Sequence, residues 1–294
     1  MRTVSINSAN WPLRRRNDAG AVSASKPTRF FTLQSYRQSP AQAALWFVVA
    51  WLLLLATWEV AVAVDLLNQR ILPPPSQTLP YLFSGDVGVG FGSQKTRLWS
   101  SLALTLGRVS LGLALAIVCA LGAVIAMSES RWLRRLAMPI FQAIAPIAPV
   151  AWIPFTIAVI GLGARSAVFI VFMAVIGSAT LSLFAAIERV PLEYLKIAES
   201  LQTSRQRLWR QVLLPAIAPS IATTVRLSFF AAWMAVLAGE MAGLNSGLGY
   251  LIVMGQQTYN MKLVMLSILL IALVGLLMDR GLVWLSSRFR AAAA

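Results

Sequence analysis

Six apolar stretches of membrane-spanning length dominate this chain and limit what it can fold into. They occupy residues 43–64, 99–127, 137–160, 164–187, 220–239 and 263–285. About 20 consecutive apolar residues in a helix cross the hydrocarbon core of a bilayer, where every backbone N–H and C=O needs a partner within the protein. Helices meet that requirement, so we expect an all-α, polytopic integral membrane protein with six transmembrane helices. Composition agrees, because 58% of the residues are hydrophobic and only 12% are charged.

The distribution of basic residues predicts the orientation. The net charge of +15 alone would suit a nucleic-acid partner. With the N-terminus inside, however, the cytoplasmic segments hold 18 Lys and Arg side chains and the opposite segments hold five. This positive-inside bias predicts cytoplasmic N- and C-termini, a cytoplasmic 188–219, and outward-facing 65–98 and 241–262. We therefore expect anionic lipid as the contact of these charges, and no nucleic acid.

Residues able to carry catalysis or bind a metal are scarce. The chain has no His and one Cys, Cys119, inside an apolar stretch, which excludes internal disulfides and Cys-rich metal sites. A stretch similar to a phosphate-binding loop, GVGFGSQKT, fails the motif because Gln94 stands where Gly must precede Lys95. We expect no enzyme activity, cofactor or metal, so any ATP chemistry must come from a separate chain. The first apolar stretch also begins too late for a secretory signal peptide.

The polar interruption at 188–219 predicts two short helices between two apolar spans. Pro191 suits the start of the first helix, and Thr203 and Ser204 are predicted to cap the second. An apolar stripe follows, and Pro215 and Pro219 are expected to stop this helix before the next span. The stripe consists of Leu208, Trp209, Val212 and Leu213. Such a helix pair is either a docking surface for a soluble partner or an interfacial pair resting on lipid headgroups.

This interruption resembles the EAA loop of binding-protein-dependent ABC importer permeases, whose pattern is E-A-A-x-x-x-G followed by I-x-L-P. Aligning Val212, Leu214 and Pro215 with the end of that pattern places Ala198 on its third position, where it matches. The chain departs from the pattern at Lys196, at Ile197, and at Gln202, which takes the place of the glycine.

Further segments resemble the nitrate, taurine, alkanesulfonate and bicarbonate branch of these permeases. The resemblance covers roughly residues 45–288. It is carried by ILPPPSQTL (71–79), PVAWIPFTIAVIGLG (149–163), RLSFFAAWMAVLAGEMAGLNSGLGYLI (226–252) and LMDRGL (277–282).

The resemblance implies a type I ABC importer permease of a bacterial inner membrane, working as a homodimer. It implies ABC ATPase subunits and a periplasmic or lipoprotein solute-binding protein as partners. The expected substrate is a small oxyanion such as nitrate, an alkanesulfonate or taurine, with a thiamine-precursor pyrimidine as the alternative. The residues expected to dock the ATPase are Leu192, Leu195, Lys196, Ala198, Glu199, Leu201 and Gln202.

Other function classes fit the sequence less well. A secondary transporter would show inverted repeats with broken helices in corresponding positions, and none is found between 43–160 and 164–285. A membrane enzyme would need a convergent set of acid, base, nucleophile or metal ligands.

For a permease we expect four regions along the chain. They are a tail at 1–42, a first helix with a periplasmic loop at 43–98, a core at 99–288 containing the loop 188–219, and a C-terminal tail at 289–294.

Prolines and charges inside the apolar stretches give the pathway or gate candidates. The third stretch contains Pro139, Pro146, Pro149 and Pro154, so it either lines the pathway or is a kinked structural helix. The pathway or gate candidates in this third stretch are Pro146, Pro149 and Trp152. Gly107, Gly112 and Gly122 predict close helix contacts in the second stretch.

Intramembrane charges are energetically unfavourable and therefore informative. Arg108 and Arg226 either attract an anion or are structural, paired with a carboxylate or reaching the interface. Glu240 opens a glycine-containing hairpin, 241–262, which we expect it to hold through backbone N–H groups, since it would repel an anionic substrate. Glu59 and Asp279 are expected to tie helices together, with Arg280 as the neighbouring partner of Asp279.

Overall fold

The structure, a computed structural model, describes residues 40–66, 68–69, 71–80 and 98–292. The predicted tail therefore lies outside the described residues up to residue 39, as does the stretch GVGFGSQKT. The chain divides into two compact units, residues 1–51 and 52–294, and the contacts discussed below lie within the second. The last helix runs to Ala292 and so includes most of the predicted C-terminal tail, 289–294.

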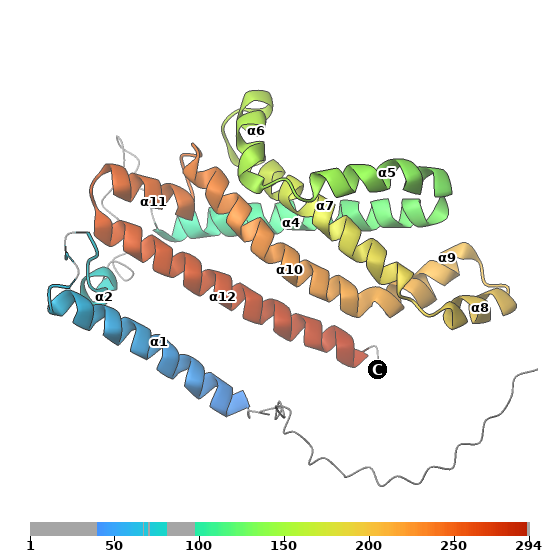
Figure 1. Cartoon of the computed structure of the whole chain (residues 1–294), viewed down its shortest axis with the longest axis horizontal. Coiled ribbons are helices and arrows are strands. Elements are labelled where there is room, and N and C mark those ends of the chain that lie inside the picture. Colours follow the sequence, from blue (N-terminus) through green and yellow to red (C-terminus); the bar gives the residue numbers. More distant parts are fainter. Residues whose placement is uncertain (1–39, 67, 70, 81–97, 293–294) are drawn as a thin grey trace, which may run out of the picture. The chain divides into compact units, whose positions relative to one another are not determined.

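The regular structure of the described residues is helical and contains no strand, which confirms the all-α prediction. Five helices are long and apolar enough to cross a membrane, and a bent helix pair can supply a sixth crossing. In chain order the elements are α1 (Pro40–Ala63), α2 (Pro75–Thr78), α4 (Leu98–Glu129), α5 (Arg131–Ile144), the 3₁₀ turn η1 (Pro149–Ala151), α6 (Trp152–Ile160), α7 (Ala164–Glu188), α8 (Leu192–Ser200), α9 (Arg205–Arg207), the π-helical turn η2 (Leu208–Leu213), α10 (Leu214–Met241), α11 (Leu248–Gln257) and α12 (Met261–Ala292) (Figure 1).

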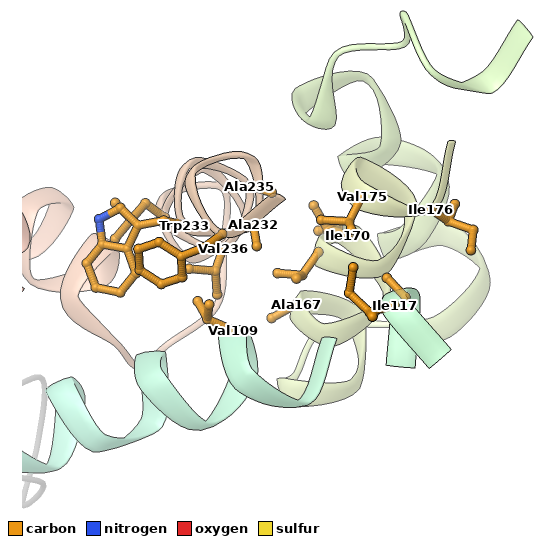
Figure 2. Packing of buried hydrophobic residues seen from close by; sticks show 14 of the residues in the cluster. Val109, Ile117, Ala167, Ile170, Val175, Ile176, Ala232, Trp233, Ala235 and Val236 are labelled. Atoms are coloured by element: carbon orange, nitrogen blue, oxygen red, sulfur yellow. The ribbon is translucent and has the colours of Figure 1, made fainter. Parts of the chain in front are cut away.

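The core forms where α7 packs against α4 and α10. Small and β-branched side chains meet there, including Val109, Ala167, Ile170, Ala232 and Val236 (Figure 2). Small residues let membrane helices approach closely. Van der Waals contacts between the helices then stabilise the packing, because lipid provides no hydrophobic driving force for helix association.

Only one of the three glycines predicted to allow close helix contacts does so within this chain. A β-carbon at Gly112 would lie 2.6 Å from Val171 Cγ1 on α7. Gly107 and Gly122 have no neighbouring atom within 4 Å of such a β-carbon. Within the described part of this chain the expected close contact is therefore not made at those two positions, because a glycine shows that close packing is permitted but not which helix face is covered.

The predicted third span, 137–160, is not one continuous helix. α5 and the following η1–α6 segment are bent by 95°. Ala148, which precedes Pro149, is extended (φ −60°, ψ 139°), the conformation that a following proline favours. α5 itself begins earlier than predicted, at Arg131, and buries none of its residues.

A second expectation also fails, because Pro215 and Pro219 do not separate the loop from the next span. The helix runs without interruption from Arg205 to Met241. The π-helical turn η2 immediately precedes Leu214–Pro215. Its wider i→i+5 pattern changes the hydrogen-bond register ahead of Pro215, so the missing N–H and the ring are accommodated instead of ending the helix.

The bend before η1 rests on α7 at a glycine, which gives a test of the fold. A β-carbon at Gly177 would lie 2.8 Å from both the Cα and the N of Ala145. Gly177→Ala should therefore push against backbone and lower stability by roughly 1–3 kcal/mol. Gly122→Ala, with open space around it, should be neutral or stabilising by up to about 1 kcal/mol. Thermal unfolding of the two purified variants in detergent compares them directly, and equal midpoints would contradict the proposed contact.

Candidate coupling loop and intramembrane ion pairs

The loop helix α8 ends in a Schellman motif. The Gln202 N–H donates to the Glu199 carbonyl (2.9 Å) and the Thr203 N–H to the Ala198 carbonyl (3.1 Å). This pair of bonds requires a left-handed residue at Gln202, which has φ +49°. Glycine is the usual residue there, so the position that the sequence register aligned with the family glycine is the one whose backbone favours glycine.

The predicted caps of the second loop helix act differently. Ser204 occupies the N-cap position of α9, but its side chain makes no capping hydrogen bond. The Thr203 hydroxyl instead donates to the Ala198 carbonyl (2.8 Å) and so stabilises the end of α8. The capping prediction is therefore wrong for Thr203, because the turn conformation at Gln202 directs it back towards the preceding helix. For Ser204 the predicted position is confirmed, but the capping hydrogen bond is absent.

The residues predicted to dock an ATPase divide between two faces of α8. Leu192, Lys196, Glu199, Leu201 and Gln202 are exposed. Leu195 is half-buried against the apolar cluster around Leu213 and Ile217, and Ala198 is buried within the chain, with 4% of its surface exposed. Ala198 therefore does not present its side chain to a partner in this structure.

Two exposed apolar residues that the sequence reasoning did not select complete the outer face. Tyr194 and Ile197 are exposed and join Leu201 at i, i+3 and i+7. Helical periodicity could have identified them once Leu195 and Ala198 were assigned to the inner face.

The sequence reasoning also missed two ion pairs close to the loop 188–219. Glu129, the last residue of α4, accepts hydrogen bonds from Arg205 and from Trp209 Nε1, the latter at 2.7 Å. Arg134 on α5 pairs with Glu188 at the end of α7, and its guanidinium lies 4.6 Å from the centre of the Phe184 ring. Partners this distant in sequence carry no local pattern that would reveal them.

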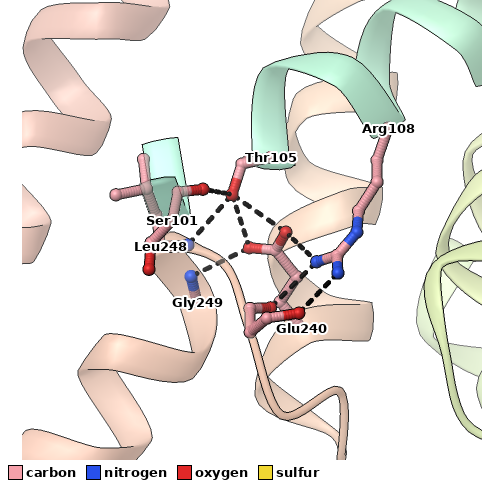
Figure 3. A network of polar contacts seen from close by, with 7 residues as sticks. Ser101, Thr105, Arg108, Glu240, Leu248 and Gly249 are labelled. Carbon is pink, nitrogen blue, oxygen red and sulfur yellow. Dashed lines mark hydrogen bonds and ion pairs between the residues drawn. The ribbon is translucent and has the colours of Figure 1, made fainter. Parts of the chain in front are cut away.

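A buried polar network surrounds Glu240, the next-to-last residue of α10 (Figure 3). Its carboxylate accepts from Arg108 Nη1 (2.8 Å), from the Thr105 hydroxyl (2.9 Å) and from the Gly249 N–H (3.0 Å). The Thr105 hydroxyl also accepts from the Leu248 N–H (2.9 Å). Glu240 thus joins α4, α10 and the start of α11.

The same network fixes the turn that follows α10. Arg108 donates to the carbonyl of Ser246 (2.8 Å) and to its hydroxyl (2.6 Å). Gly247 has φ +111°, and a β-carbon there would fall 2.1 Å from the Glu240 carboxylate. The side chain of Glu240 is 0% exposed, so as a pathway candidate it offers no free surface. Its contact with the Gly249 N–H is of the kind expected for holding the hairpin.

A second intramembrane ion pair joins α10 to α12. Arg226 donates from Nε to Asp279 Oδ1 (2.6 Å) and from Nη2 to Oδ2 (2.9 Å), a bidentate pair. Of the two roles considered for Arg226, attraction of an anion and structural pairing, the structural role requires a carboxylate from another span, and Asp279 is such a carboxylate. Glu59 makes a different tie, accepting from the Ser76 hydroxyl (2.7 Å) and N–H (3.2 Å) at the start of α2.

The remaining pathway candidates gather at the bend between α5 and α6. Pro146 is exposed, and Pro149 and Trp152 are half-buried. The Trp152 ring packs edge-on against Phe155, and its Nε1 is buried with no hydrogen-bond partner. No group of three or more His, Cys, Asp or Glu residues in the described part of the chain could hold a metal ion.

The Glu240 network predicts a distinctive double-mutant result. Glu240→Gln leaves Arg108 buried without a counter-charge, which should lower stability by about 3–5 kcal/mol. Adding Arg108→Gln removes the unpaired charge and should recover part of that loss, so the two effects should not add. Thermal unfolding of wild type, both single variants and the double variant forms the cycle. Strictly additive losses would show that the pair is not coupled.

Comparison with known proteins agrees with this architecture. The family described as binding-protein-dependent transport system inner membrane component matches residues 86–291. The chain is 28% identical over 229 residues to the taurine transport system permease protein of Escherichia coli strain K12, covering 78% of this chain and 82% of that one. It is 28% identical over 251 residues to the nitrate import permease protein of Synechocystis, covering 81% and 86%.

Two further comparisons extend the likeness. A putative ABC transporter permease of Methanocaldococcus jannaschii is 31% identical over 236 residues, covering 79% of this chain and 86% of that one. An inward-facing methionine ABC transporter structure superposes with a TM-score of 0.54 at 17% identity, covering 67% of this chain and 96% of that chain, which shows a shared fold. Because the family match spans more than half of its residues, this chain belongs to the binding-protein-dependent transport system inner membrane components.

Proposed function

We propose that this ABC importer permease carries a small oxyanion inward, driven by a separate ABC ATPase that docks on α8. Two copies form the pore in a bacterial inner membrane, with both termini in the cytoplasm, and a periplasmic or lipoprotein solute-binding protein supplies the solute. The carrying observation is the exposed apolar face of α8, where Tyr194, Ile197 and Leu201 are exposed on a polar loop between two spans. Exposed apolar residues in such a row mark a contact with a protein or with a membrane surface, and membership of the ABC permease family supports the protein.

The relatives support the substrate class. Their names specify taurine, bicarbonate and nitrate, small solutes that each carry an anionic group. The thiamine-precursor pyrimidine that the sequence left open finds no support among these relatives.

Solute selection within the membrane does not rest on a free arginine in the described residues. Arg108 and Arg226 both bind carboxylates, at 2.8 Å and 2.6 Å. The Arg108 guanidinium is buried, so an anion would have to displace Glu240 to reach it, which would leave a buried charge unpaired. The Arg226 side chain is 43% exposed, but its Nε and Nη2 donors already bind Asp279. This favours selection by the solute-binding protein, with the permease providing passage and coupling.

Docking is tested by a charge on the outer face of α8. Ile197→Asp places an unpaired charge in the proposed contact, and one such change of at least 1.4 kcal/mol weakens binding about tenfold or more. The tagged chain is purified from its native membranes, and co-purifying ABC ATPase is quantified by mass spectrometry. The matched control is Leu162→Asp, an apolar residue of similar exposure on the α6–α7 connection. Equal ATPase recovery from both variants would refute the docking assignment.

The wild-type complex from the same preparation tests the substrate class. After reconstitution with its solute-binding protein, ATP hydrolysis should rise with taurine, nitrate or bicarbonate and not with a thiamine-precursor pyrimidine.

Topology is tested by thiol labelling. In a Cys119→Ala background, Tyr259→Cys in the α11–α12 turn should react with a membrane-impermeant thiol reagent on spheroplasts, whereas Ser204→Cys should not. Both side chains are exposed, so reactivity reports the side of the membrane. The reverse pattern would place α8 outside and exclude ATPase docking there. Ser93, in the other segment expected to face outward, 65–98, lies outside the described residues.

A further inference from the structure

Glu129 holds the coupling loop against α4. It is the last residue of α4, and its carboxylate binds Arg205 of α9 and Trp209 of η2. Both donors belong to the helix that continues without a break into α10. One carboxylate therefore joins the end of one long helix to the beginning of another.

The same two helices are joined again at their other ends. Thr105 and Arg108, near the start of α4, bind Glu240 near the end of α10. Arg108 and Glu129 are about 30 Å apart along α4, at about 1.5 Å per residue. α4 and α10 also pack against each other directly. The two connections and the two helices form a closed frame from the loop to the hairpin that follows Glu240.

The two connections differ in exposure. The Arg108 and Glu240 side chains are 7% and 0% exposed, whereas Arg205 and Glu129 are 80% and 34% exposed. Exposed ion pairs contribute little to folding stability. The Glu129 connection can therefore be removed without unfolding the chain, which makes its mechanical role testable.

The π-helical turn shows why such a connection is needed. Trp209 lies within η2, the least regular part of the helix from Arg205 to Met241. Without the bond to Glu129, a displacement of α8 and α9 could be absorbed at this turn. With the bond to Glu129 in place, the displacement would also move α4, whose Thr105 and Arg108 bind Glu240.

We propose that Glu129 is a positioning residue for energy coupling: through Arg205 and Trp209 it makes α4 and α10 move together when the ATPase displaces the loop. This inference rests on the proposed function, since it presupposes an ATPase docked on α8.

The first experiment measures the connection itself, without ATPase or solute. Spin labels at Ser128→Cys and Ser204→Cys, both exposed, are placed in a Cys119→Ala background of the full-length chain. The interlabel distance distribution should be narrow in the otherwise unchanged chain and broader in Glu129→Ala. It should be intermediate in Glu129→Gln, which keeps an acceptor oxygen but loses the charge, and in Trp209→Phe, which keeps an aromatic ring but loses the indole N–H. The control Glu188→Gln breaks an exposed ion pair on the same side that does not join α4 to α10, and should leave the distribution unchanged.

The second experiment measures coupling in the reconstituted complex, as uptake of taurine, nitrate and bicarbonate per ATP hydrolysed. Glu129→Ala should retain its ATPase and its basal hydrolysis while uptake per ATP falls about fivefold or more, the scale of a modest coupling energy. Its thermal midpoint should stay within about 2 °C of wild type, as expected for an exposed pair. Glu188→Gln should behave as wild type.

The outcomes separate the two ideas. An unchanged distance distribution in Glu129→Ala overturns the inference whether or not transport is observed. A broader distribution with unchanged uptake per ATP also overturns it, because the contact would then be structural only. If wild type itself recruits no ATPase and shows no ATP-driven uptake, the proposed function fails, and with it the coupling role.

Discussion

A carboxylate buried in an apolar bundle must be matched by charge and hydrogen bonds, and Glu240 shows how much structure that demands. Leaving it unpaired would be strongly destabilising, so α4 presents Thr105 and Arg108 to it, and α11 contributes the Gly249 N–H. The turn must also pass so close to the carboxylate that only glycine fits at residue 247. The position of the outer hairpin, the pairing of α4 with α10 and the start of α11 all depend on this one group.

The mutual pairing of the intramembrane charges affects how the permease can treat an anion. Arg108 is bound to Glu240 and Arg226 to Asp279, so each pair is close to neutral overall. A strongly attractive interior would retain an anion that must be released on the far side. A neutral interior would let such a solute leave, which suits the proposed ATP-driven import of an anion delivered by a solute-binding protein.

Sequence patterns predicted the helices better than the contacts between them. Runs of apolar residues identified the spans because the length requirement of a bilayer is local, and the prolines around Pro149 anticipated a bend without giving its 95° angle. Arg108 and Glu240 each stood out as charges in apolar stretches, but their pairing depends on residues more than a hundred positions apart. The continuity through Pro215 was missed because it depends on a π-helical turn, which has no clear sequence signature. On α8, the loop register was predictable from the pattern, whereas the inward orientation of Ala198 required the fold.

The left-handed residue at the end of α8 bears on the stiffness of the coupling element. Where the family pattern has glycine, this chain holds Gln202 at φ +49°, a conformation that is unfavourable by roughly 1–2 kcal/mol for a residue with a β-carbon. The two bonds of the Schellman motif keep it there. A β-carbon also narrows the backbone conformations near that minimum, so α8 has less freedom to pivot on α9 than a glycine hinge would give it. Gln202 thus makes the end of α8 less favourable in backbone energy but more rigid, at the place where a docked partner would move the membrane domain.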